Sequence, residues 1–210
     1  MACDMRGNNM ETMGLIIVDL LENFCAYIIP SSIFAILMGC LFWNIQKNGI
    51  RNVIISYLTE MRYNGRLIYQ FLFFLYVYFI FDRTLLSRHF GWSSGLGNIM
   101  GGWTLLDPET GKITFEAVEN FAFFVPYIIL FFLSFNTGKR GMEILKKSFF
   151  VGALTSIFIE MGQMIFKVGE FQISDLTYNT LGAVIGGVIF LVGGSLKNKC
   201  TKKKIKGKQL

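Results

Sequence analysis

The stretch from Gly152 to Gly187, GALTSIFIEMGQMIFKVGEFQISDLTYNTLGAVIGG, decides the fold. It reads as two apolar helices, each with polar or small residues at helical spacing on one face. Those residues are Ser156, Glu160 and Gln163, then Asp175 and Asn179, with Gly182 and Gly186 continuing the second face. An ionisable carboxyl group at membrane depth costs about 2–3 kcal/mol even on lenient insertion scales, so Glu160 is a candidate functional residue.

The composition of the whole chain indicates an integral membrane protein. Hydrophobic residues make up 53% of the 210 residues and charged residues only 16%, which leaves too little polar surface for a soluble globule of this size. Residues 1–13 show no apolar run and no signal-peptide cleavage pattern, so we expect the first apolar segment to stay as an anchor.

Five segments are apolar and long enough to cross a bilayer, which takes about 17–25 residues. They are residues 25–45, 67–86, 119–135, 149–166 and 179–196. An interfacial helix is expected at 15–24 and an amphipathic helix lying on the membrane at 51–63. The sequence therefore predicts an all-α, polytopic membrane helical bundle with about five transmembrane helices.

The chain divides into three parts on this pattern. Residues 1–66 hold the interfacial helix, the first span and the amphipathic segment, residues 67–196 form a four-helix membrane domain, and residues 197–210 form a Lys-rich tail. The segments 46–66, 136–148 and 197–210 carry 15 of the 20 Lys and Arg residues. Because cytoplasmic loops retain positive charge, the N-terminus is predicted outside and the C-terminus in the cytoplasm. We favour a topology anchor over nucleic-acid binding for the tail, because it follows a span.

The sequence offers no metal or redox site. Cys3, Cys25, Cys40 and Cys200 lack ligand or redox spacing, and His89, the single histidine, has no Cys or His neighbour at ligand spacing. We therefore expect no metal, no disulfide and no cofactor.

With this topology, polar residues from four spans fall at one outward-facing depth. Glu160 lies in the outer half of its span, and Asp175 and Asn179 stand at the outer mouth of the last one. Asn120 stands at the outer mouth of the third span, and Arg88 follows the second. Intramembrane acids usually pair with a base or a hydrogen-bonding neighbour, so these residues predict an outward-facing polar pocket.

Four short motifs in this region occur in a fixed order. They are Thr84-Leu-Leu-Ser-Arg88, Asn120-x-x-x-Phe124-x-Pro126, Ser156-x-x-x-Glu160-x-x-Gln163 and Asp175-x-x-x-Asn179-x-x-Gly182-x-x-x-Gly186. Together they resemble the VanZ-like family of bacterial membrane proteins, which is associated with resistance to the glycopeptide teicoplanin. The resemblance runs from about residue 80 to 190, and residues 1–66 and the tail lie outside it.

The resemblance implies a multi-pass protein of the bacterial plasma membrane that acts in the Gram-positive cell envelope. Its candidate pocket residues are Arg88, Asn120, Glu160, Gln163, Asp175 and Asn179. Two positions depart from the family pattern: Lys167 stands where many relatives carry an Arg, and Ser174 where a second acid is common. Lysine lacks the bidentate fork of arginine, which weakens the case for an anion clamp in this loop. Ser174 is suited to cap the fifth span.

Most of these residues also have a purely structural interpretation. Gly182 and Gly186 are expected to let the last span approach the fourth closely, and Pro126 fits a kink in the third span. Asn120, Gln163 and Asn179 fit hydrogen bonds between helices. Glu160 and Asp175 are the exceptions, because packing does not explain an acid at this depth.

Three functions remain open at this stage. The resemblance favours an envelope protein that lowers glycopeptide susceptibility, with membrane lipids and a lipid-linked cell-wall precursor or a glycopeptide as partners. An intramembrane enzyme would use Glu160 and Asp175 on a lipid-linked substrate, although no nucleophile set accompanies them, so the sequence does not decide whether any reaction is catalysed. A small transporter or lipid-binding scaffold is the third class. The oligomeric state is not determined by the sequence.

Overall fold

The computed structural model describes residues 27–42, 49–88, 96, 99–103, 115–135 and 141–206. Within these ranges every regular element is a helix, which confirms the predicted all-α class. The elements are α2 (Gly49–Met61), α3 (Gly65–Phe81), the π-helix η1 (Asp82–Leu86), α4 (Phe115–Phe135), α5 (Gly141–Phe166) and α6 (Ile173–Lys206), preceded by an apolar helix at Tyr27–Phe42.

Four helices in the described part of the chain are long and apolar enough to cross a membrane. They are Gly65–Leu86, Ala117–Phe135, Gly141–Phe166 and Ile173–Ser195, and they correspond to the last four predicted spans. The first predicted span is described as Tyr27–Phe42, which falls among shorter apolar helices. The amphipathic segment forms α2, whereas the expected interfacial helix at 15–24 lies outside the described residues.

Two helices, α5 and α6, extend furthest beyond the predicted bounds. α5 begins at Gly141, eight residues before the apolar run, and α6 continues through the Lys-rich tail to Lys206. Lysine is a good helix former, and no proline interrupts either extension. The sequence pattern therefore located the hydrocarbon-facing parts of these helices but not their polar continuations.

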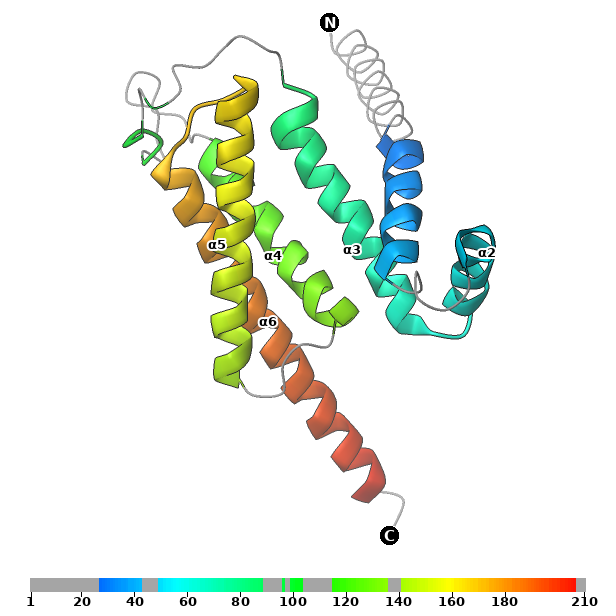
Figure 1. Cartoon of the computed structure of the whole chain (residues 1–210). Coiled ribbons are helices and arrows are strands. Elements are labelled where there is room, and N and C mark those ends of the chain that lie inside the picture. The colour runs from blue at the N-terminus through cyan, green and yellow to red at the C-terminus, as the bar shows by residue number, and fades with distance from the viewer. Residues whose placement is uncertain are drawn as a thin grey trace, which may run out of the picture.

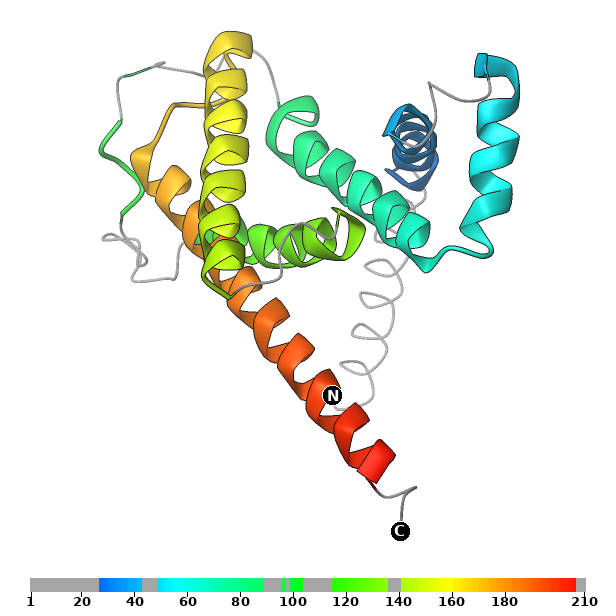
Figure 2. The same cartoon turned by 60° about the horizontal axis from the view of Figure 1, so that its bottom comes forward.

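Consecutive long helices run in opposite directions (Figure 1). α6 crosses and packs against both α4 and α5, while α3 packs mainly against α4 (Figures 1 and 2). The helix Tyr27–Phe42 and α2 lie at the α3 edge of the bundle (Figure 1). The end of α3 with η1, the start of α4 and the turn between α5 and α6 lie together at one end of the molecule, here called the η1 end.

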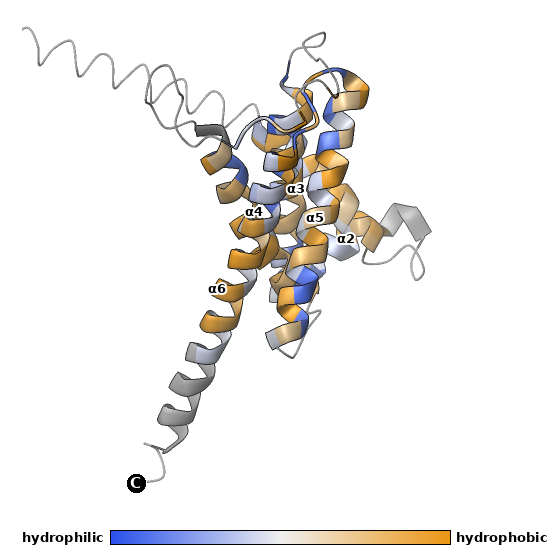
Figure 3. Cartoon of the chain, turned by 90° about the vertical axis from the view of Figure 1, so that its left-hand side faces the viewer, coloured by the Kyte–Doolittle hydropathy of each residue, from blue (hydrophilic) through white to orange (hydrophobic). Residues whose placement is uncertain are grey.

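The side chains agree with a membrane setting. Hydrophobic residues cover the helices along most of their length (Figure 3). On α5 alone, Phe150, Phe158 and Ile165 are each more than half exposed, as expected where a helix faces lipid. Between α3 and α4 the core is aromatic: the ring of Phe73 lies 5.5 Å from that of Tyr127 and 5.3 Å from that of Phe135, centroid to centroid. These helices identify the chain as a membrane protein.

Small residues on α6 face two different neighbours. A Cβ on Gly182 would lie 3.0 Å from the carbonyl carbon of Phe121, and one on Gly186 would lie 2.5 Å from the carbonyl oxygen of Val125, so both glycines face α4. The expectation that they let α6 approach α5, the fourth predicted span, is wrong. Each residue advances an α-helix by about a quarter turn, so the residue after each of these glycines lies on a different face of α6. Those residues are Ala183, which packs on Gly152 of α5, and Gly187, which packs on Ser148 of α5.

Two further features concern packing. Pro126 lies inside α4, which continues as helix to Phe135. Tyr57 of α2 is fully buried beside Cys40 and Leu67, with its ring over Gly39 of the preceding helix. Burial raises the pKa of Tyr57 to about 12, so this phenol stays neutral at physiological pH.

Candidate functional site

The site is built on the contact between α5 and α6, which follows a regular antiparallel register. We call it the α5–α6 seam. Its first three pairs are Ser148 with Gly187, Gly152 with Ala183, and Ser156 with Asn179. In the third pair the Asn179 side-chain amide donates a hydrogen bond of 2.9 Å to the Ser156 hydroxyl. Each step moves four residues toward the end of α5 and four residues toward the start of α6, as expected for neighbours on one helical face.

Glu160 and Asp175 lie one turn beyond the last of these pairs. Glu160 is four residues after Ser156, and Asp175 is four residues before Asn179, so each acid is on the face of its helix that carries the seam. Only 1% of Glu160 and 8% of Asp175 is exposed. Two buried acids therefore stand at the η1 end of the seam.

The start of α6 contributes to holding the Glu160 carboxylate. The backbone N–H of Gln172, the residue before α6 begins, donates a hydrogen bond of 3.0 Å to Glu160 Oε2. The first N–H groups of a helix have no partner within the helix, and the helix dipole favours negative charge there. This contact offsets part of the cost of burying the acid.

Gln163 connects α5 to the π-helix. Its side-chain amide donates a hydrogen bond of 3.1 Å to the carbonyl oxygen of Thr84 in η1. Carbonyl groups near the end of a helix have no regular partner in the helix, so Gln163 satisfies one of them. Gln163 is 4% exposed and lies one turn beyond Glu160, which brings η1 next to the acidic pair.

Arg88 brings a positive charge to the same place. Its Nη1 atom lies 3.2 Å, and Gln163 Oε1 lies 3.0 Å, from the point that a Cβ on Gly169 would occupy. The missing side chain of Gly169 therefore leaves room for the half-buried Arg88 guanidinium in the α5–α6 turn. Lys167, in contrast, is exposed and ends α5 with a φ of 54°, a left-handed conformation common just after a helix.

Five of the six candidate residues form a cluster, and the sixth, Asn120, lies apart from it. Seam register, hydrogen bonds and close packing bring together Arg88, Glu160, Gln163, Asp175 and Asn179. Asn120 is half-buried on α4, directly before the Phe121 carbonyl that faces Gly182. Among the described residues, no hydrogen bond joins Asn120 to the cluster.

Sequence reasoning missed one contributor to the site and one buried acid in the adjoining π-helix. Gln172 acts through its backbone N–H, which no side-chain pattern reveals. Asp82 of η1 is 8% exposed, and its Oδ2 atom has no hydrogen-bond partner among the described residues. The sequence signal for Asp82 is an acid at the end of an apolar run. π-Helical turns often occur at functional sites.

A short segment ahead of α4 lies against the start of α6. Ile173 donates its backbone N–H to the carbonyl oxygen of Ile99 at 3.0 Å, and Gly102, with a φ of 77°, packs against the Ser174 hydroxyl. Ser174 is fully buried within the first turn of α6, and its hydroxyl donates to the Gln172 side chain at 3.4 Å. Ser174 is thus the second residue of α6 and does not occupy the N-cap position for which the sequence suited it.

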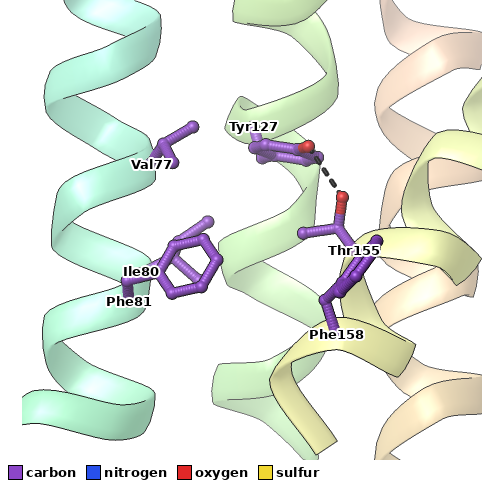
Figure 4. Close-up of a pocket in the computed structure, with 6 residues that line it drawn as sticks. All are labelled: Val77, Ile80, Phe81, Tyr127, Thr155 and Phe158. Carbon is purple, nitrogen blue, oxygen red and sulfur yellow. Dashed lines mark hydrogen bonds between the residues drawn. The ribbon is translucent and has the colours of Figure 1, made fainter. Parts of the chain in front are cut away.

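Two apolar cavities lie on the α3 side of the bundle. The smaller has a volume of about 130 Å³ and is lined by Val77, Ile80, Phe81, Tyr127, Thr155 and Phe158 (Figure 4). In it the Tyr127 and Thr155 hydroxyls share a hydrogen bond of 2.8 Å (Figure 4). The larger, of about 430 Å³, is lined by Phe34, Tyr78, Phe81, Leu85 and Leu86. Residues of η1 therefore contact an apolar cavity on one side and the polar cluster on the other.

The donor set in the described part of the chain is not that of a metal centre. No three His, Cys, Asp or Glu side chains gather closely enough there to hold a metal ion. What the cluster offers is two carboxyl groups, two side-chain amides and one guanidinium. These groups can bind hydrogen-bond donors, anions or protons.

Comparison with known proteins places the chain in a family. A family model described as VanZ/LLP1 matches residues 10–194. The match begins near the N-terminus, so the expectation that residues 1–66 lie outside the family is wrong. No curated protein and no solved structure matches the chain.

Proposed function

The chain belongs to the VanZ/LLP1 family, and we propose that it is a multi-pass protein of the bacterial plasma membrane that lowers susceptibility to teicoplanin. One observation carries this proposal: the acids Glu160 and Asp175 are both buried at the η1 end of α5 and α6, with Gln163 one turn from Glu160 and Arg88 packed into the α5–α6 turn. Simple packing of a helical bundle does not call for two acids in this position.

The distribution of charge supports an outward-facing site. The described parts of the segments that carry most of the Lys and Arg residues are α2 with the start of α3, the start of α5 and the end of α6, all away from the η1 end (Figure 1). The positive-inside rule assigns that basic side to the cytoplasm. The acids would then face the outer leaflet, where lipid-linked cell-wall precursors present their peptides.

The chemistry of the site suits such a ligand. Carboxylate oxygens and the Asn179 amide accept hydrogen bonds from peptide N–H groups, and the Arg88 guanidinium binds carboxylate or phosphate. The apolar cavity beside η1 has room for part of a lipid chain. A lipid-linked precursor and an acylated glycopeptide such as teicoplanin each combine a polar peptide with an apolar anchor, so both are candidate ligands, together with ordinary membrane lipids.

Expression in a susceptible Gram-positive host tests the proposal. We expect tolerance to teicoplanin to rise more than tolerance to vancomycin, because the pocket acts where an acyl anchor and the precursor meet. Glu160→Gln should abolish the gain at unchanged protein abundance. Glu143→Gln is the matched control, since it makes the same change on the same helix at an exposed position near the opposite end, and it should retain the gain.

Two outcomes would contradict the proposal. Unchanged tolerance together with a chemical modification of lipid-linked precursors that requires Glu160 would replace it with the enzyme alternative. Equal loss of tolerance in Glu160→Gln and Glu143→Gln would show that the acid at the η1 end has no special role.

A further inference from the structure

The smaller cavity on the α3 side of the bundle opens toward lipid. Its two walls come from α3 and α5, which have little direct contact with each other, and Tyr127 of α4 lies between them (Figure 4). Phe158 on the α5 wall is 68% exposed, and the cavity lies near the middle of the spans that hold Tyr127 and Thr155. The bilayer core holds no water, so what reaches this cavity from the side is hydrocarbon.

The size of the cavity fits a segment of a hydrocarbon chain. Apolar cavities of about 150 Å³ bind a molecule such as benzene, and this one measures about 130 Å³. Phe81 lines both this cavity and the larger one of about 430 Å³. The two cavities are therefore neighbours across one side chain, and a chain held in the smaller one can continue past Phe81 into the larger one.

One pair of polar groups interrupts the apolar lining. The Tyr127 and Thr155 hydroxyls share a hydrogen bond of 2.8 Å, and either of them can be its donor (Figure 4). Thr177 and Thr180 of α6 donate to carbonyl groups one turn earlier, whereas no such bond is found for Thr155 within the described residues. Two hydroxyls bring two protons, and the shared bond uses one. Whichever hydroxyl donates, one O–H therefore has no acceptor among the described residues.

We propose that this cavity binds part of a polyprenyl chain, with the spare O–H of the Tyr127–Thr155 pair directed at a carbon–carbon double bond. A donor without an acceptor is costly away from water, and the ester carbonyls of phospholipids lie at the interface, outside the hydrocarbon core. The π electrons of an unsaturated group accept a weak hydrogen bond. A polyprenyl chain repeats its double bond in every five-carbon unit, so one of them can meet the hydroxyl pair in any register, whereas a saturated chain offers none.

This inference deepens the proposed function and rests on it for the identity of the lipid. The larger cavity is lined by Leu85 and Leu86 of η1, so a chain that continues into it leads toward the η1 end. A lipid-linked precursor with a polyprenyl anchor would then place its head group near Arg88 and Gln163. Binding of the chain can be measured without an antibiotic, so the two proposals can fail separately.

Photolabelling of the full chain in phospholipid vesicles tests the inference. One probe is a polyprenyl phosphate with a diazirine in its chain, and the other is a saturated alkyl phosphate of the same length with the same diazirine. Mass spectrometry of peptides locates the label. At Phe81 and Phe158 we expect the polyprenyl probe to label about two- to fivefold more than the saturated probe, the ratio that one weak hydrogen bond gives. Ile185, exposed near the middle of α6, should be labelled equally by both.

A double variant separates the hydroxyl pair from the shape of the cavity. Tyr127→Phe combined with Thr155→Val removes both hydroxyls and nearly keeps the side-chain volumes, so the cavity should still be labelled, but equally by the two probes. Tyr76→Phe combined with Thr177→Val is the matched control. It makes the same two changes at hydroxyls that do not line the cavity, and it should keep the preference for the polyprenyl probe.

Three results would overturn the inference. They are labelling by the polyprenyl probe that is no stronger at Phe81 and Phe158 than at Ile185, equal labelling of the cavity by both probes in the wild-type chain, and a preference that survives in the Tyr127→Phe, Thr155→Val variant. The first two need no variant, so they decide the matter even if the double variant does not accumulate in the membrane. Labelling as expected in a chain that gives no teicoplanin tolerance would overturn the proposed function alone.

Discussion

Replacing Gly182 with alanine should separate α6 from α4. A Cβ at this position would meet the carbonyl oxygen of Phe121 well inside van der Waals contact, and would lie 3.0 Å from its carbonyl carbon and 3.2 Å from Phe124 Cβ. Two of these three atoms belong to the backbone of α4, which cannot rotate out of the way. The helices must therefore move apart, and the packing of Gly186 on Val125 one turn along must loosen with them.

The expected loss is that of overpacking a well-packed interface, about 1–3 kcal/mol. For a chain of this length each kcal/mol lowers the melting temperature by about 2–4 °C, so Gly182→Ala should melt about 2–12 °C below the wild type. Gly193→Ala is the matched control on the same helix, because no atom lies within 4 Å of its added Cβ. Alanine favours helix over glycine by up to about 1 kcal/mol, so the control should melt at or slightly above the wild type.

Heating a fluorescent fusion in mild detergent and measuring the monodisperse fraction by size-exclusion chromatography gives both melting temperatures. If Gly182→Ala and Gly193→Ala melt together, the close contact of α6 with α4 described above is wrong. A loss in both variants would instead indicate that any added methyl group on α6 is harmful.

Two further predictions concern orientation and α2. In a chain without native cysteines, single cysteines near Trp103 and Phe171 should react with impermeant reagents from outside, while those near Lys139 and Lys203 should be protected; the reverse pattern would place the site on the cytoplasmic side. Tyr57→Phe should raise the melting temperature by about 2–4 °C, because it removes a buried hydroxyl with no partner among the described residues. A lower melting temperature would mean that this hydroxyl is satisfied.

Much of the architecture could be predicted from the sequence because bilayer thickness and helical period leave few solutions. The lengths of the apolar runs identified four long helices, and the four-residue interval between Ser156 and Glu160 placed both on the face of α5 that meets α6. The same period does not say which neighbour a face meets. That is why Gly182 and Gly186 were assigned to α5 although they pack on α4.

Only the part of the site that consists of unusual side chains could be predicted from the sequence. Glu160 and Asp175 stand out in an apolar sequence, but the hydrogen bond from the Gln172 backbone and the reach of Arg88 into the turn at Gly169 depend on how distant segments meet. The position of a residue in the sequence does not by itself show its role, as Lys167 illustrates. It occupies the loop position that an arginine takes in many relatives, yet its side chain is exposed. The positive charge in the turn comes from Arg88 instead.

The central claim is that Glu160 and Asp175 act as one site, and a double-mutant cycle tests it most directly. The measurement is teicoplanin tolerance of cells expressing the wild type, Glu160→Gln, Asp175→Asn or both changes, each corrected for the amount of protein in the membrane. Residues of one site are not independent, so each single change should remove most of the gain, and the double change should remove little more. Two partial losses that add in the double variant and follow a fall in protein abundance would contradict the claim, because the acids would then only stabilise the bundle.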